Sequence, residues 1–174
     1  ILRGVNLERA KLAESSLYRT NLIGAQLQRA QIESTNLALS KLSFADLSYA
    51  DLSGAILWKA DLVAAKLVYS NLTGTSLRGA NLARANLMNA DVRNSDLSGA
   101  HLNGANLKNS NFTDSILRGV DFSNFHMIFS LKTKLSGANF TRADLTGTNL
   151  GQAQLKNSIL CHTKTPWGID NSDC

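Results

Sequence analysis

The sequence predicts an all-β chain wound as a coil around a filled axis, and three features of its 174 residues support this. An apolar residue recurs at every fifth position. A small residue stands two places before nearly every one of them. Glycine, asparagine and aspartate, which tolerate tight turns, recur at fixed places between them. Together these features indicate a backbone that turns once every five residues.

The apolar positions, here called centres, fall at residues 2, 7, 12 and onward to 127. All 26 are apolar and 21 are leucine. Five residues advance an α-helix by about 500°, so successive centres would be displaced by about 140° and would share no buried face. A flat strand would place successive centres on opposite faces. A chain that turns every five residues keeps each centre pointing inward.

The sites beside the centres fit the same backbone. Of the 25 sites two places before a centre, 22 are Ala, Ser or Thr, and the exceptions are Val5, Val120 and Phe125. The site immediately before a centre is often Asn or Asp. At Asp46 and Asp51 we expect local hydrogen bonds to the turn rather than paired catalytic carboxylates.

Tandem units such as "ADLSG" at 50–54 and "ANLAR" at 80–84 resemble the pentapeptide-repeat family, over about residues 1–160. The resemblance implies a right-handed quadrilateral β-helix with four pentads in each coil. Residues 20 apart, such as Leu22 and Leu42, should then stack in columns that form a dry core. A second series of centres, from Leu135 to Leu160, brings the expected total to about eight coils.

The repeat is interrupted between Met127 and Leu135, where the spacing is eight rather than five, so the stretch 124–134 holds three extra residues. Phe125 stands where a small residue belongs, and Ile128 and Phe129 follow closely. One interpretation is an irregular, bulged corner with an aromatic side chain wedged against the shaft. The other is a protruding apolar loop that contacts a partner.

The last residues, 161–174, read "CHTKTPWGIDNSDC" and leave the repeat. We expect them to cap the coil, with Trp167 over its last turn, because an open edge promotes aggregation. The tail resembles that of family members from photosynthetic bacteria and chloroplasts, some of them lumenal. A Cys161–Cys174 disulfide would need an oxidising compartment, which favours the thylakoid lumen or periplasm over the cytoplasm. Two free thiols are the alternative.

Catalytic, cofactor and metal sites are not indicated by any motif. Phosphate-binding, nucleophile-elbow and metalloprotease motifs do not occur in the sequence, and the three histidines lack partners at metal-ligand spacing. No run approaches the ~20 apolar residues that a membrane-spanning helix needs. Because the chain starts at Ile1 rather than Met, we expect that a preceding piece is missing. The sequence predicts a protein that is not an enzyme and does not insert into a membrane.

Large apolar side chains occupy outward sites that are usually polar, and these predict a partner-binding patch. Its members are Ile23, Phe44, Tyr49, Val63, Val68, Tyr69 and Met88. A second, weaker cluster consists of Leu39, Ile56 and Trp58, with Tyr18 nearby. Alternatively, these side chains are scattered and exposed, or a preceding segment covers them.

The leading functional prediction is a rigid, non-catalytic scaffold that binds an unidentified protein, with a homodimer through one coil end as a further possibility. One branch of the family mimics DNA and protects DNA gyrase, but that mimicry needs an acidic surface and the net charge here is +5. Nucleic-acid binding through arginines such as Arg9 and Arg29, with Tyr49 and Tyr69 stacking on bases, is the third prediction. It is disfavoured because the arginines point to several sides.

Overall fold

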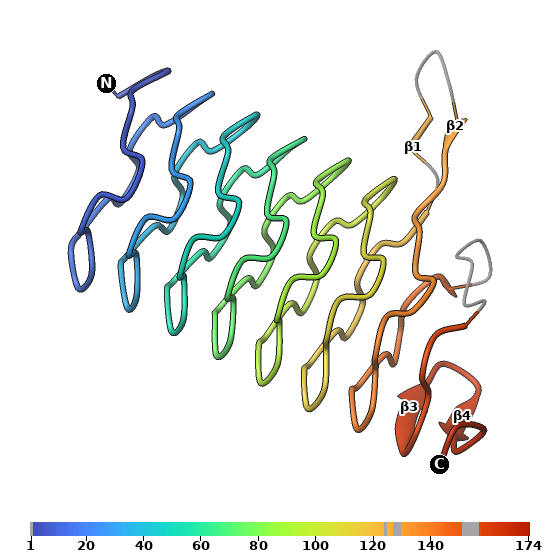
Figure 1. Cartoon of the computed structure of the whole chain (residues 1–174). Helices are drawn as coiled ribbons and strands as arrows, with labels where there is room; N and C mark the ends of the chain where they lie inside the picture. The colour runs from blue at the N-terminus through green and yellow to red at the C-terminus, as the bar shows by residue number, and fades with distance from the viewer. Residues whose placement is uncertain (1, 124, 127–129, 151–156) are drawn as a thin grey trace.

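The computed structural model describes residues 2–123, 125–126, 130–150 and 157–174. Four residues named above lie outside this part of the chain: Ile1, Met127, Ile128 and Phe129. Figure 1 shows a row of similar coils stacked from the N-terminus toward the C-terminus, with short hairpins near the C-terminal end.

Each coil contains 20 residues and has four sides. Single parallel β-bridges join residues 20 apart, and the first four pairs are Asn6–Gln26, Lys11–Gln31, Ser16–Asn36 and Asn21–Lys41. Apart from Lys164, every residue in these single bridges stands one place before a centre. Because each side contributes only one bridging residue, the sides of the coil are too short to count as strands. The 20-residue period implied by the family resemblance is confirmed, whereas the right-handed sense and the count of about eight coils remain predictions.

The pentad at 61–65 shows how one side is built. Leu62 donates its N–H to Asn81 in the next coil, with N and O 2.7 Å apart. Ala65 donates its N–H to the Leu62 carbonyl at 3.0 Å and closes the turn. Between them, Ala64 has a φ of 55°, in the left-handed region that Gly, Asn and Asp adopt most easily. This requirement explains why those residue types recur at the turns.

The Asn and Asp side chains before the centres stabilise the same turns. The Asp46 carboxylate accepts the Ser48 N–H at 3.1 Å, and the Asp51 carboxylate accepts the Ser53 N–H at 2.9 Å. These are the local turn bonds expected from the sequence.

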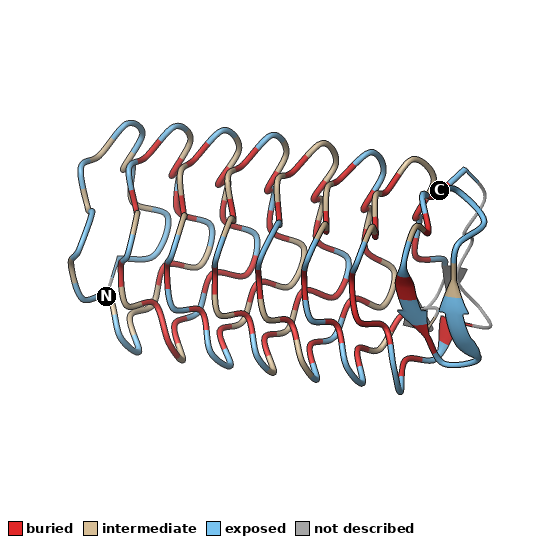
Figure 2. Cartoon of the chain, turned by 90° about the horizontal axis from the view of Figure 1, so that it is seen from below, coloured by how far each residue is buried: buried red, intermediate tan, exposed pale blue. Residues whose placement is uncertain are grey.

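The core is a set of leucine columns flanked by small residues. Centres from Leu22 to Phe122 are fully buried, and so are the small residues two places before them from Ala25 onward. In the first coil, Leu7, Leu12 and Leu17 are only half-buried. Figure 2 shows this gradient as exposed colouring at the N-terminal end and buried colouring along the inner coils.

The interruption is larger than the sequence predicted. After Phe122 the bridges change from a spacing of 20 to one of 28, as in Asn106–Lys134, so eight residues are inserted rather than three. In the part of the chain that the structure describes, the centre that follows Phe122 is Leu135, and Met127 lies outside the described residues.

The inserted chain leaves the shaft as a hairpin rather than as a bulged corner. Strand β1 (Phe125–His126) pairs antiparallel with β2 (Ser130–Leu131). Figure 1 shows β1 and β2 standing out from the row of coils. This arrangement agrees with the protruding interpretation.

The coil resumes at Thr133, which is fully buried. Its hydroxyl accepts the Gly104 N–H at 3.0 Å and lies 3.0 Å from the Phe122 carbonyl oxygen. Farther along, the rings of Phe112 and Phe140 stack with centroids 5.3 Å apart. Phenylalanine therefore replaces leucine in one core column beside the insertion.

The C-terminal residues form a second hairpin, in which β3 (Thr163–Thr165) pairs antiparallel with β4 (Gly168–Asp170). Lys164 still bridges to Asp144, so the 20-residue register extends beyond residue 160. The domain boundary at 160 stays a prediction. The expectation that Trp167 covers the last coil is wrong, because Trp167 lies in the turn between β3 and β4 and is 61% exposed.

Candidate protein-interaction surface

One corner of the shaft carries a stack of flat side chains. Arg29, Tyr49 and Tyr69 follow the centres of three successive coils by two places. The two tyrosine rings are 5.2 Å apart between centroids and inclined by 11°. The Arg29 guanidinium lies 5.6 Å from the Tyr49 ring centroid. The sequence-predicted column is therefore present, and both tyrosines remain about half exposed.

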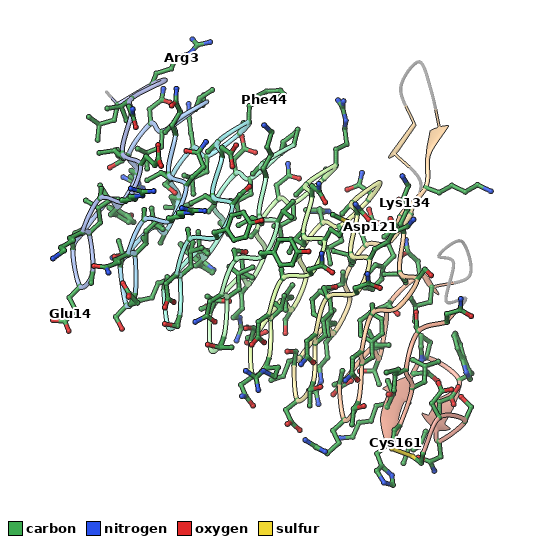
Figure 3. The ribbon with its side chains drawn as sticks, in the orientation of Figure 1. Arg3, Glu14, Phe44, Asp121, Lys134 and Cys161 are labelled. Carbon is green, nitrogen blue, oxygen red and sulfur yellow. A yellow bond between two sulfur atoms is a disulfide. The ribbon has the colours of Figure 1, made fainter. Side chains whose placement is uncertain are left out.

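Phe44 occupies the preceding corner and is 62% exposed, and Figure 3 shows it pointing away from the shaft. Backbone hydrogen bonds connect each exposed aromatic residue to an apolar residue of the next coil. These bonds run from Phe44 to Val63, from Tyr49 to Val68 and from Tyr69 to Met88, at 2.9, 2.9 and 3.1 Å.

We call the seven predicted residues the aromatic patch: Ile23, Phe44, Tyr49, Val63, Val68, Tyr69 and Met88. The structure brings them together around one side of the shaft. Phe44 and the tyrosines are at the two corners of this side, Val68 and Met88 lie on it, and Ile23 and Val63 lie just across the Phe44 corner. Ile23 and the three other aliphatic members are half-buried.

The side of the shaft between these corners is positively charged, which the sequence analysis did not identify. Counted with the corner of Tyr49 and Tyr69, its cations are Arg9, Arg29, Lys66, Lys108 and Lys134, and its carboxylates are Glu8 and Asp46. Sorting the residues by 20-residue columns would have revealed this excess. The side therefore combines exposed aromatic rings with surplus positive charge.

Within this side, the pKa of Asp46 is lowered. Partial burial raises it, but hydrogen bonds from Ser48 and the nearby Lys66 ammonium outweigh that effect. Lys66 Nζ lies 3.4 Å from Asp46 Oδ2 in the preceding coil. Arg9 Nε likewise lies 3.6 Å from Glu8 Oε1, so two of the five cations have a carboxylate partner within the shaft.

The second predicted cluster lies on the opposite side of the coil, two pentads away. Tyr18, Ile56 and Trp58 are 46%, 43% and 41% exposed. The Lys59 ammonium lies 4.8 Å from the Trp58 ring centroid. Leu39 is half-buried and donates its N–H to the Trp58 carbonyl at 2.9 Å. This cluster is separate from the aromatic patch and offers a matched control for it.

The side that contains Asp51 lies between the aromatic patch and the second cluster, and it carries more carboxylates than cations. It holds Glu14, Glu33, Asp51, Asp91 and Asp114 against Lys11, Arg93 and Arg142. Two of the carboxylates form close ion pairs, Asp91 with Arg93 and Asp114 with Arg142, both at 2.6 Å. The interspersed cations interrupt any continuous acidic surface along this side.

The C-terminal tail contains the predicted disulfide, which joins Cys161 to Cys174 with their Cα atoms 4.9 Å apart. The bond is visible near the label of Cys161 in Figure 3. The possible metal-ligand atoms of Cys161, His162 and Cys174 all lie within 4.8 Å of one another. The sequence analysis missed this group, since neither cysteine stands at metal-ligand spacing from the other.

Within the residues that the structure describes, no helix has the length and apolar character required to span a bilayer.

Comparisons with known proteins agree with the repeat pattern. The family model for pentapeptide repeats matches eight copies, over residues 1–38, 45–84, 85–124 and 132–160. A search of curated proteins finds no match.

Several solved structures are similar to this chain. HetL, a pentapeptide repeat protein involved in heterocyst differentiation regulation in the cyanobacterium Nostoc sp. strain PCC 7120, is 27% identical over 95% of this chain and 91% of its own, with a TM-score of 0.30. AT2G44920, from the Arabidopsis thaliana thylakoid lumen, is 26% identical over 68% of this chain and 70% of its own, with a TM-score of 0.39. QnrB1, a plasmid-mediated fluoroquinolone resistance protein, is 20% identical over 89% of this chain and 79% of its own, with a TM-score of 0.38.

The family match covers most of the chain, and the five-residue period, the turn hydrogen bonds and the 20-residue coil all agree with it. The chain belongs to the pentapeptide-repeat family and folds as a β-helical solenoid.

Proposed function

We propose that this protein is a rigid, non-catalytic scaffold that binds another protein through the aromatic patch. The proposal includes a right-handed β-helix of about eight coils as the frame. The observation that supports it most is the Tyr49–Tyr69 stack, with exposed Phe44 on the next corner. Clusters of exposed aromatic residues are typical of interaction sites.

The backbone beneath the patch lowers the entropic cost of binding. Each coil is hydrogen-bonded to the coils on both sides, as when Asp46 donates its N–H to the Ala25 carbonyl and Leu47 donates to the Lys66 carbonyl, at 2.9 and 2.7 Å. A surface that is already ordered loses little conformational freedom when a partner binds. The patch therefore suits recognition by a preformed surface.

The partner that fits this surface carries acidic groups around an apolar contact. The five cations of the patch side outnumber its two carboxylates. Complementary charge of this kind accelerates association and excludes positively charged competitors. Mimicry of DNA toward gyrase is disfavoured by the same excess of positive charge. Nucleic-acid binding is disfavoured because Arg29 and Tyr69 already flank the faces of the Tyr49 ring.

Two further expectations belong to this proposal. A homodimer through one coil end is the first of them. The Cys161–Cys174 disulfide favours an oxidising compartment, such as the thylakoid lumen or periplasm.

Affinity capture from the native source tests the patch. The baits are the full chain, the variant Phe44→Ser/Tyr49→Ser/Tyr69→Ser, and the control Tyr18→Ser/Ile56→Ser/Trp58→Ser on the opposite side. We expect the wild type and the control to recover the same protein and the patch variant to lose it. Equal recovery by the patch variant would overturn the proposal.

A deletion separates the arrangement of the patch from its composition. Removing residues 50–54 takes out one pentad between Tyr49 and Tyr69 and none of the patch residues. Because the pentads are nearly equivalent, we expect the shaft to re-form with Tyr69 moved to the corner of Phe44. Circular dichroism should remain that of the wild type while capture is lost. Retained capture would show that the Tyr49–Tyr69 stack is not the recognised feature.

A further inference from the structure

We propose that Cys161, His162 and Cys174 form a zinc site when the disulfide is reduced. Their sulfur and nitrogen atoms lie within 4.8 Å of one another. Zinc–sulfur and zinc–nitrogen bonds of about 2.3 and 2.0 Å place the ligand atoms of a tetrahedral site within about 4 Å of each other. Small side-chain rotations therefore suffice to bring all three onto one ion.

The fold brings these residues together through the second hairpin. Cys161 and His162 directly precede β3, and the turn that carries Cys174 follows β4. The pairing of Thr163 with Asp170 brings the end of β4 beside the start of β3. The three ligands are thus gathered by backbone pairing that does not involve sulfur.

Two side-chain hydrogen bonds hold the terminal turn in place independently of the disulfide. The side-chain oxygen Oδ1 of Asn171 accepts the His162 backbone N–H at 3.1 Å. The Asp173 carboxylate accepts the Leu160 N–H at 2.9 Å. When the disulfide is reduced, these bonds keep Cys174 beside Cys161, so the site is largely preformed.

The redox step balances with an ordinary dithiol as reductant. The Cys161–Cys174 bond takes two electrons and two protons and becomes two thiols, while the dithiol is oxidised to its own disulfide. Zinc then binds both sulfurs as thiolates and displaces their two protons to solvent, and neutral His162 supplies a nitrogen. Water fills the fourth position, as in open sites with two cysteines and one histidine.

The consequence is that the terminal turn is cross-linked in both redox states. A covalent bond joins it to the shaft under oxidising conditions, and a metal ion joins it under reducing conditions. The oxidised form is excluded from metal binding because disulfide sulfur is not a thiolate. This site lies at the chain end, so its test does not depend on the aromatic patch.

Cobalt(II), which takes the place of zinc in thiolate sites, is the probe. The full chain is reduced with a dithiol, freed of it without oxygen, and titrated with cobalt(II). We expect thiolate-to-cobalt charge-transfer absorption that saturates at one ion per chain and disappears when zinc is added. The oxidised chain and the variant Cys161→Ser/Cys174→Ser should give no such band.

His162→Ala tests the third ligand, and His101→Ala is its control on the shaft. Loss of His162 should weaken cobalt binding by more than about tenfold, since even loss of an outer-shell partner costs ten- to a hundredfold. His101→Ala should bind as the wild type does. The proposal is overturned if the reduced wild type gives no band, or if His162→Ala binds cobalt as tightly as the wild type.

Discussion

The regular shaft, residues 21–122, and the C-terminal region, residues 125–174, differ in how their coils are held together. In the shaft, the same backbone bonds recur at a spacing of 20 over buried leucines. In the C-terminal region the spacing rises to 28 across the insertion and then returns to 20, two hairpins appear, and single contacts are added to the repeated ones. Examples are the Thr133 hydroxyl at the end of the insertion and the Asn149 amide, which donates to the Asp121 carboxylate at 2.7 Å.

This difference predicts how each region responds to damage. A shaft coil shares its contacts with two neighbours, so losses there should spread through the stack. A change in the C-terminal region should remove one specific connection and leave the shaft intact. Four experiments with single or paired variants test this contrast.

The largest effect should come from the buried core of the shaft. Leu62→Ala should lower the free energy of unfolding by about 2–5 kcal/mol, because Leu62 is fully buried and its removal leaves a cavity between coils. Leu7→Ala, in the half-buried first coil, should cost clearly less. Denaturant unfolding of both variants measures the difference. Equal losses would show that the first coil is packed as tightly as the inner ones.

The disulfide should stabilise the folded state by less than the buried core does, and its effect should be confined to the C-terminal residues. Cys161→Ser/Cys174→Ser, in metal-free buffer, should cost about 3 kcal/mol in the chain-entropy estimate, since the bond closes a loop across 13 positions. Hydrogen exchange should accelerate for residues 160–174 and stay unchanged in the shaft. Faster exchange throughout the shaft would contradict the separation of the two regions.

Two turn positions of the shaft allow a matched pair of substitutions that should change the stability in opposite directions. Gly74 and Ala64 occupy the same turn position, with φ of 67° and 55°. A Cβ at Gly74 would meet nothing within 4 Å, so only the backbone opposes it. Gly74→Ala should therefore cost about 1 kcal/mol, whereas Ala64→Gly should be neutral or slightly stabilising. Thermal unfolding gives both values, and a loss of stability in Ala64→Gly would contradict the strained turn.

The smallest effect concerns the carboxylate of Asp144. Burial raises its pKa, but hydrogen bonds from Thr146 and Arg118 outweigh this and leave the pKa below its ordinary value. Arg118 Nε lies 2.7 Å from Asp144 Oδ2. Because the folded pKa is lowered, the stabilisation is present above about pH 4 and is lost as the pH falls through the folded pKa.

Asp144→Asn keeps a turn acceptor but removes the charge, so it should cost less than about 1 kcal/mol at neutral pH. The difference from wild type should vanish in acid. Denaturation of both proteins at neutral pH and below pH 4 gives the comparison. A difference that persists unchanged in acid would mean that the charge is not the cause.

Most of the shaft could be predicted from sequence because the residue types within each pentad determine how that pentad turns. Leucine at a five-residue spacing fixes which side chains point inward, and the implied 20-residue coil then places Tyr49 beside Tyr69. The insertion was underestimated because the five-residue apolar pattern continues to position 127 without a break in the sequence. An apolar residue in phase does not by itself show that the coil continues.

The C-terminal tail was less predictable for a different reason. Trp167 follows the only proline and lies in a tight turn, where its side chain is exposed despite its hydrophobicity. The proximity of His162 to both sulfurs depends on hairpin pairing that no residue spacing encodes. Predictions therefore succeeded where contacts repeat along the shaft, and they failed where a single turn determines the position of a side chain.

The central claim is that residues 20 apart become neighbours on one side of the shaft, which is what makes the aromatic patch a single surface. Engineered cysteines test this directly. Ser48→Cys/Val68→Cys joins adjacent coils, whose spacing of about 4.8 Å suits a disulfide. Ser48→Cys/Thr73→Cys places the thiols on neighbouring sides. After mild oxidation, mass spectrometry should find the intramolecular bond in the first variant and free thiols in the second, and the reverse result would contradict the fold and the patch together.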